Sequence, residues 1–322
     1  MSRKLRFLLL GLAIVLITAL VIVLAFREAP RQFADENFDT RVSRPAYAEQ
    51  HPKVLFDEAH HNIHTVSGLY SPFASLLTND GYQIVQNKEP FSKKMLEGYS
   101  VLVIANALGA NDANDSSAFT DAECDAVRDW VQAGGSLLLI TDHAPTGAAA
   151  ENLAKRFSVE MSKGMTEDPE NSDTSSGDRT QLVFTRENSL LGEHPITQGR
   201  VQGEKLNKVM TFTGQSLKAR EGAVAFLRLG ESAMNRAASV KVEKAGGDTR
   251  VLITYGDPIS ASGFAQGVAL EFGKGRVVVL GEAAMLTAQI DGKTKTPFGM
   301  NVAGIDNRQL ALNILHWLSR IL

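Results

Sequence analysis

Polar side chains that could do chemistry gather at three points of the sequence, each directly after a short apolar run. These residues are Asp57, Glu58, His60 and His61 after KVLF, Asp142 and His143 after SLLLIT, and Glu282 after RVVVLG. His64 belongs to the first group. Gln289, Asn301 and Asn307 follow the third, where they could line the same cleft or only cap loops. Carboxylates and imidazoles are the side chains that most often donate, accept or relay protons and bind metals. The sequence therefore predicts a tentative catalytic or binding site wherever these three segments meet.

Three interpretations of these groups stay open. A divalent metal could be bound, with His60, His61, Asp142 and His143 as candidate ligands, because imidazole nitrogen and carboxylate oxygen are ordinary ligands of zinc and other transition metals. A histidine tuned by a neighbouring carboxylate could instead work as an acid or base without metal. The same groups could also only cap loops and helix N-termini. The spacing D-E-x-H-H-x-x-H is not the H-E-x-x-H zinc motif and does not decide among them.

The elements around these points alternate between strands and helices. The runs 99–105, 136–141 and 276–280 are short and mostly apolar without alternation, which is typical of strands buried in a parallel sheet. A capping box, T-D-A-E, opens a helix at Thr120, and Gly134 and Gly135 end it. This order predicts an α/β fold with a mostly parallel sheet and helices on both faces. Ligands of such sheets bind beyond the carboxyl ends of the strands, where the polar groups lie.

An apolar segment near the N-terminus predicts a membrane anchor. Residues 7–26, FLLLGLAIVLITALVIVLAF, contain no charge, and a helix of that length covers about 30 Å, the thickness of the hydrocarbon layer. Arg3, Lys4 and Arg6 precede it, which keeps residues 1–6 in the cytoplasm. The run is longer than the apolar part of a signal peptide and ends at a poor cleavage site. We expect a single-pass inner-membrane protein with a polar stalk over 27–52 and a periplasmic or other extracytoplasmic domain over 53–322.

Composition excludes several classes of protein. The formal net charge is −3, and the pI is about 6.2, whereas nucleic-acid binders carry a basic surplus. One cysteine, Cys124, excludes a disulfide framework within the chain and a zinc site made of cysteines.

The run TDAECDAVRDWVQAGGSLLLITDHAP, residues 120–145, resembles the class I glutamine amidotransferase-like superfamily, which has a flavodoxin-like α/β fold. With FDEAHHN, GEHPIT, GKGRVVVLGEAAMLTAQ and NRQLALNILHWL, the chain is most similar to uncharacterised bacterial membrane-anchored proteins with the domain of unknown function 4350. The resemblance covers residues 53–322. The superfamily's amidotransferases carry a nucleophilic cysteine on a turn that matches ITDHAPTG here, and this turn has none. The resemblance thus implies the fold and argues against glutamine hydrolysis.

Two classes of function follow from these observations. The first is an envelope protein whose domain binds a small molecule or a protein partner, with an accessory role in transport or surface assembly. The second is a hydrolase, metal-dependent or not, that uses the Asp, His and Glu groups at the strand ends. The missing nucleophile motif favours the binding protein.

Overall fold

The computed structural model describes residues 32–109, 117–219, 221–245 and 248–322, and side chains throughout these ranges except 242–251. The predicted cytoplasmic N-terminus and transmembrane helix, residues 1–26, lie outside the described residues. Within the described ranges, no helix combines the length and the apolar character that crossing a membrane requires.

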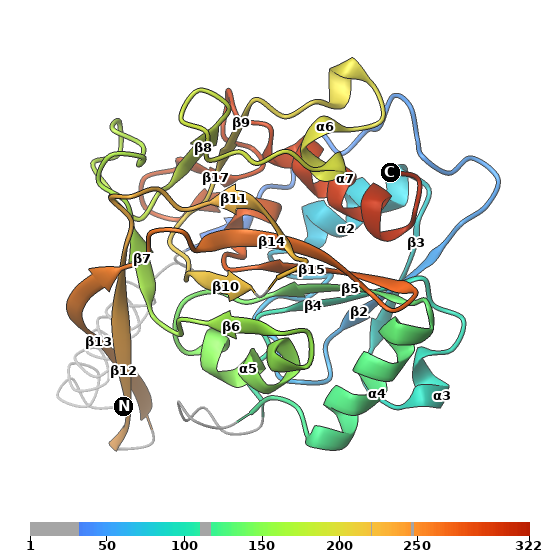
Figure 1. Cartoon of the computed structure of the whole chain (residues 1–322), viewed down its shortest axis with the longest axis horizontal. Helices are drawn as coiled ribbons and strands as arrows, with labels where there is room; N and C mark the ends of the chain where they lie inside the picture. Colours follow the sequence, from blue (N-terminus) through green and yellow to red (C-terminus); the bar gives the residue numbers. More distant parts are fainter. Residues whose placement is uncertain (1–31, 110–116, 220, 246–247) are drawn as a thin grey trace, which may run out of the picture.

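A nine-stranded sheet forms the centre of the fold (Figure 1). Its strands lie in the order β3 (Gln83–Asn87), β2 (Lys53–Asp57), β4 (Val101–Ala105), β5 (Ser136–Ile140), β15 (Gly275–Leu280), β14 (Ala265–Phe272), β10 (Leu217–Ala219) and β6 (Val159–Met161), and β11 (Val224–Arg228) also pairs with β14. From β3 to β15 all neighbours are parallel, and from β15 to β6 they are antiparallel. The parallel half carries the polar groups predicted from the sequence.

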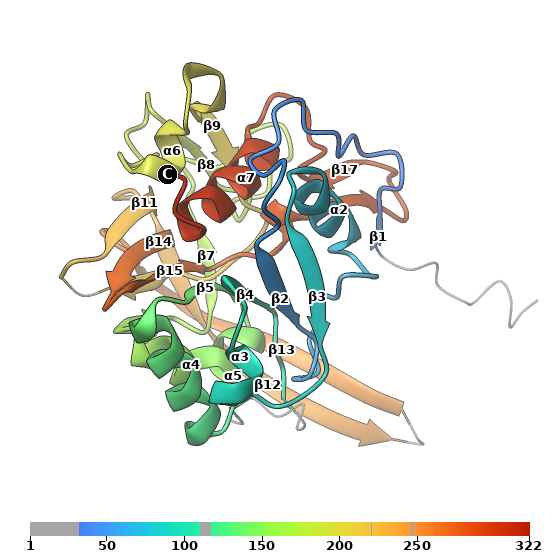
Figure 2. The same cartoon turned by 90° about the vertical axis from the view of Figure 1, so that its right-hand side faces the viewer.

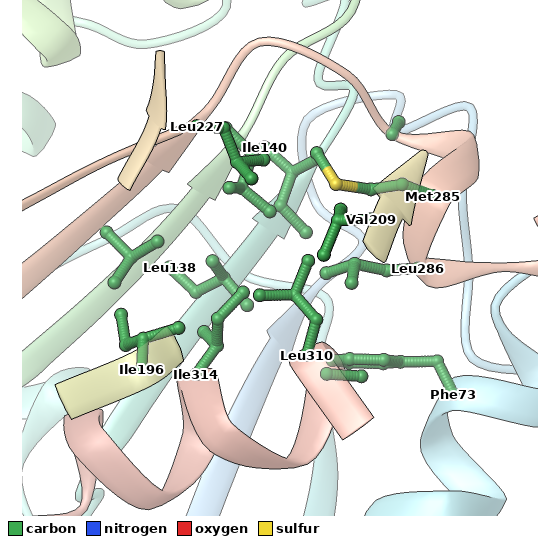
Figure 3. Packing of buried hydrophobic residues seen from close by; sticks show 14 of the residues in the cluster. Phe73, Leu138, Ile140, Ile196, Val209, Leu227, Met285, Leu286, Leu310 and Ile314 are labelled. Carbon is green, nitrogen blue, oxygen red and sulfur yellow. The ribbon is translucent and has the colours of Figure 1, made fainter. Parts of the chain in front are cut away.

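Helices cover both faces of this sheet, which confirms the predicted α/β layers. One face carries α2 (Ser71–Asn79), α6 (Pro195–Gln198) and α7 (Asn307–Leu318), and the other carries α3 (Lys93–Leu96), α4 (Asp121–Ala133) and α5 (Thr146–Arg156) (Figure 1). Two short 3-10 helices, η1 (Gln202–Glu204) and η2 (Ala284–Leu286), lie in the connections. Each face has its own apolar cluster, because successive strand residues point to opposite sides of a sheet. Figure 3 shows the cluster under α7, where Leu310 and Ile314 pack towards Leu138.

Helix α4 forms where the sequence predicts it. The Thr120 hydroxyl accepts the Glu123 backbone N–H at 3.3 Å, and the Glu123 carboxylate accepts the Thr120 N–H at 2.9 Å. Gly134 ends the helix at φ 131°, a backbone conformation that favours glycine. This reciprocal cap fixes the position of Glu123 at the start of the helix, which matters for the site described below.

The expected stalk differs from the structure. Strand β1 (Gln32–Ala34) pairs with β16 (Ala288–Asp291), which also pairs with β17 (Pro297–Gly299). Further along, the Tyr47 ring lies against Tyr82 with 5.1 Å between centroids, and Asp80 accepts the Ala46 N–H at 2.8 Å. Residues 32–52 therefore belong to the folded domain, because their few apolar side chains contact its core.

A long hairpin extends from the domain beside the strand ends (Figure 2). It is formed by β12 (Met234–Ala245) and β13 (Asp248–Ser260), and β12 also pairs with β7 (Met165–Glu167). A separate pair, β8 (Val183–Thr185) and β9 (Lys208–Met210), lies on the α7 side.

Candidate ligand site at the carboxyl ends of the strands

The three polar segments do reach one edge of the sheet. Asp57 ends β2, Asp142 follows β5, and Glu282 follows β15, and these three strands run parallel. The neighbours β5 and β15 bring Asp142 and Glu282 together, as predicted. Asp57, however, is separated from Asp142 by β4.

Successive side chains of a strand point to opposite faces of the sheet, and this alternation places the polar side chains on two different faces. Asp57 follows Leu55, which belongs to the cluster under α4 and α5. Asp142 and Glu282 continue the rows that end with Ile140 and Leu280, which belong to the cluster under α2 and α7. The predicted convergence of all the groups into one site is therefore wrong, and two separate clusters exist.

The first cluster is a buried clasp between β2 and α4. Nδ1 of His60 lies 2.9 Å from both carboxylate oxygens of Asp57, and its Nε2 lies 2.9 Å from Oε1 of Glu123. The rings of Phe91 and Phe119 flank the imidazole with centroids at 4.6 and 4.7 Å. His60 is only 7 % exposed and Asp57 is fully buried.

Electrostatics makes His60 the cation of this clasp. Burial lowers the pKa of His60, but Asp57 and Glu123 outweigh it, so the pKa lies above its usual 6.5. Burial likewise raises the pKa of Glu123, but the hydrogen bonds from His60, Thr120 and the Phe91 backbone bring it below its usual value. An imidazolium between two carboxylates satisfies all three groups. This cluster thus fits the interpretation that these groups have a structural role. It leaves no free nitrogen on His60 for catalysis.

The remaining groups of the first segment do not form a site with it. Glu58 forms an ion pair with Lys88 and accepts the Val66 backbone N–H at 2.8 Å, so it fixes the loop after β2. His61 is exposed at φ 51°. Only His64 from this segment lies on the side of Asp142.

The second cluster is the carboxyl pair of Asp142 and Glu282. Glu282 is fully buried, and its two oxygens accept the backbone N–H groups of Ala284 at 2.6 Å and Met285 at 2.7 Å. Asp142 accepts the His143 backbone N–H at 2.7 Å, and its side chain is 18 % exposed. Asp142 is therefore the member of the pair that a ligand can reach.

Burial raises the pKa of both members of this pair, and repulsion from Asp142 adds to the effect at Glu282. Burial, and then the charge of Asp142, raise the pKa of Glu282 well above its usual value. Burial also raises the pKa of Asp142, against the opposing effect of His143. The phenol of Tyr70, which donates to the Ala283 carbonyl at 2.8 Å, has a pKa raised by burial and by both carboxyl groups. These groups therefore favour their protonated forms more than exposed carboxyl and phenol groups do.

A pocket of about 360 Å³ opens above Asp142. Its lining comes from β1, from the loops after the strands, and from the segment 284–298: Gln32, His64, Asp142, His143, Phe212, Thr213, Ala284, Gln289, Asp291 and Phe298. Tyr255 from the base of the hairpin reaches the rim, with its hydroxyl 3.4 Å from Nδ1 of His143. Tyr70 and Tyr255 carried no signal in the sequence, because nothing local links either to Asp142.

Two polar atoms of this lining lack partners. Nδ1 of His64 and Oε1 of Gln289 are buried and have no hydrogen-bond partner within the described part of the chain. Burial lowers the pKa of His64 to about 4, so its ring is neutral at physiological pH. A buried polar atom without a partner costs about 1–3 kcal/mol. Because both residues line the pocket, a polar ligand that reached these atoms would supply the missing hydrogen bonds.

The predicted metal ligands do not form a metal centre. Across the ranges that the structure describes, no group of three or more His, Cys, Asp or Glu is arranged to hold a metal ion. His60 uses both ring nitrogens in its contacts with Asp57 and Glu123, and His61 is exposed.

Cys124 lies inside α4, away from the turn after β5, and is fully buried. Burial raises the pKa of its thiol to about 12, so it stays protonated. It has neither the position nor the ionisation of a nucleophile.

Comparisons with known proteins support the fold. No family model matches this sequence, and no curated protein does. The N-terminal domain of mmIFT52 superimposes with a TM-score of 0.54 at 14% identity, over 83% of this chain and 97% of that one. The similarity shows the fold. A cytoplasmic protein from Salmonella typhimurium (TM-score 0.46, 14% identity, 83% and 98% of the chains) and a ThuA-like protein from Bacteroides uniformis (0.43, 15%, 86% and 95%) are more distant.

Proposed function

We propose that this protein is a membrane-anchored envelope protein whose class I glutamine amidotransferase-like domain binds a small, uncharged polar molecule in the pocket at Asp142. The observation that carries the proposal is the pair of partnerless buried atoms, His64 Nδ1 and Gln289 Oε1, in the lining of that pocket. A ligand with hydroxyl or amide groups can donate a hydrogen bond to the glutamine oxygen. It can also donate to the imidazole nitrogen or accept from it.

The electrostatics of the pocket supports an uncharged ligand. The two unsatisfied atoms belong to neutral side chains, since the lowered pKa of His64 keeps its ring uncharged. Asp142 and Asp291 in the lining disfavour anions. The volume is within the range of small-molecule sites, about 300–1,000 Å³. A sugar or another polyol has the size and the hydrogen-bonding groups that this lining requires.

A second function, hydrolysis, is favoured by the carboxyl pair. Asp142 has a raised pKa and reaches the pocket, while Glu282 stays behind it, fully buried. A carboxyl group tuned in this way can pass a proton between water and a bound ligand, as general acids and bases do. Glu282 would then act on the reaction only through the pKa of Asp142.

The binding proposal is tested with the full chain in a neutral detergent. Thermal unfolding is measured with a panel of uncharged monosaccharides, disaccharides and linear polyols, and the best ligand is titrated by calorimetry. Gln289→Leu should weaken its binding about three- to tenfold, the value of one neutral hydrogen bond. Gln132→Leu, on the exposed surface of α4, is the matched control. If none of the panel stabilises the protein, or if both variants bind equally, the proposal is wrong.

Hydrolysis is tested separately with Asp142→Asn. Under the hydrolase alternative, this variant still binds the ligand identified above but loses turnover. Unchanged turnover would remove Asp142 from the mechanism.

The anchor is tested by fusing a topology reporter after Leu322. Positive residues before the apolar run predict that a reporter active only outside the cytoplasm gives signal. A fusion active only in the cytoplasm would refute the proposed location.

A further inference from the structure

A second cavity, of about 540 Å³, lies away from the pocket at Asp142. Three segments form it: residues 41–44 of the N-terminal region, residues 200–204 after α6, and residues 308–312 in α7. Its lining contains four arginines, Arg41, Arg44, Arg200 and Arg308, which we call the arginine cleft. Glu204 is the one carboxylate among the lining residues, so the cleft is strongly basic in a chain whose formal net charge is −3.

Two of these arginines already have carboxylate partners. Arg41 binds Asp39 through Nε at 2.9 Å and Nη2 at 2.7 Å. Arg200 binds Glu204 with Nε at 3.0 Å and Nη2 at 2.6 Å. Their charges are largely balanced within the protein.

The other two arginines are not balanced in this way. Arg308 donates from Nε to the Asp39 carbonyl at 3.2 Å and from Nη2 to the Arg41 carbonyl at 2.6 Å. These acceptors are neutral backbone groups, and in the described ranges neither Arg308 nor Arg44 has an ion pair with a carboxylate. Burial lowers the pKa of Arg308, and the charges of Asp39 and Asp80, which favour the guanidinium, offset this only in part. A guanidinium with five donors, held in place by two carbonyls, keeps donors for a ligand.

We propose that the arginine cleft binds a phosphate-bearing anion, with Arg44 and Arg308 as the charges that the ligand neutralises. Guanidinium groups present paired N–H donors that match phosphate oxygens. Their binding costs less entropy when the side chain is already held in place. Arg41 and Arg200 would contribute the remaining N–H donors from the walls. This site is independent of the pocket at Asp142, which disfavours anions.

Phosphate groups of this kind occur on soluble metabolites and on lipid headgroups, and two probes distinguish these sources. Inorganic pyrophosphate represents the free phosphorylated ligand, and glycerophosphoglycerol represents a phosphodiester headgroup. Each is titrated by calorimetry into the full chain in neutral detergent at low salt. We expect saturable binding of at least one, weakening as the ionic strength rises. Preference for the first identifies a soluble ligand, and preference for the second identifies a headgroup.

Two variants test the residues. Arg44→Gln should weaken the bound probe about tenfold, because a hydrogen bond to a charged group is lost. Arg44 makes no side-chain hydrogen bond within the described residues, so this change should leave unfolding unaffected. Arg228→Gln removes the same charge from β11, where the side chain donates only to the Ala225 carbonyl among the described residues, and it should bind like the unmodified protein. Failure of both probes to bind, or equal losses in the two variants, would overturn the proposal, whatever happens at the pocket of Asp142.

Discussion

Replacing His60 by alanine tests the charge of the clasp. The imidazolium lies 2.9 Å from carboxylate oxygens of both Asp57 and Glu123. Its removal leaves two buried carboxylates facing each other across an empty space, and removing one partner of a buried ion pair costs about 3–5 kcal/mol. We expect a loss of that size at pH 6.

The size of this loss should depend on pH. Because the pKa of His60 is raised in the folded state, its stabilisation is fully present below the unfolded value of about 6.5 and is lost as the pH rises through the folded value. The difference between His60→Ala and the unmodified chain should therefore shrink between pH 6 and pH 10. The neutral ring has one N–H and can donate to only one of its two carboxylate partners.

Urea unfolding of the full chain provides the measurement. Tryptophan fluorescence reports on both faces of the sheet, since Trp130 is in α4 and Trp317 is in α7. His61→Asn is the matched control, because His61 is the exposed neighbour at φ 51° and asparagine tolerates that conformation. A loss below about 1 kcal/mol, or one that is the same at pH 6 and pH 10, would show that His60 is not a cation between two carboxylates.

Three further predictions concern the carboxyl pair, Cys124 and the cap of α4. Asp142→Asn should lower the pKa of Glu282, because the charge of Asp142 raises that pKa. The infrared band of the protonated Glu282 carboxyl group should then disappear at a lower pH. An unchanged titration would contradict the pairing. Because the pKa of Glu282 is higher in the folded than in the unfolded state, the folded state loses stability as the pH rises between these two pKa values. The urea midpoint of Asp142→Asn should therefore depend less on pH over this range. Cys124, with its pKa near 12, should not react with a thiol reagent at pH 8 until the protein unfolds, and rapid labelling of the native chain would refute its burial. Thr120→Ala should cost about 0.5–2 kcal/mol through the lost cap of α4, measured by the same urea unfolding. A neutral effect would show that the Thr120 hydroxyl does not stabilise the start of α4.

The local parts of the fold were accessible from the sequence because their signals are local. The mostly apolar runs identified β4, β5 and β15, and the T-D-A-E box identified the start of α4. The turn at Gly273 joins β14 and β15 as a hairpin. The alternation of strand and helix also placed the polar groups correctly at the carboxyl ends of the strands.

The site depended on information that the sequence does not contain. Whether a strand-end carboxylate faces α4 or α7 follows from the register of the whole sheet, and a shift of one residue reverses the face. Asp57 and Asp142 look alike in sequence, yet one binds His60 under α4 and the other lies beside Glu282 under α7. Glu123 shows the same limit, since its sequence indicates a helix cap and only the packing of α4 against β2 makes it a partner of His60, 63 residues away.

Packing also decided the role of the segment after the predicted anchor. Residues 32–52 are polar and contain Pro45 and Pro52, which favours a stalk on local grounds. In the structure, β1 forms backbone hydrogen bonds with β16, and the Tyr47 ring packs against the Tyr82 ring. Both partners come from other parts of the chain. The sequence thus determined which elements form and at which edge their polar groups emerge. The tertiary structure decided which of these groups meet, because side-chain partners are set by register and packing, and neither is encoded within one segment.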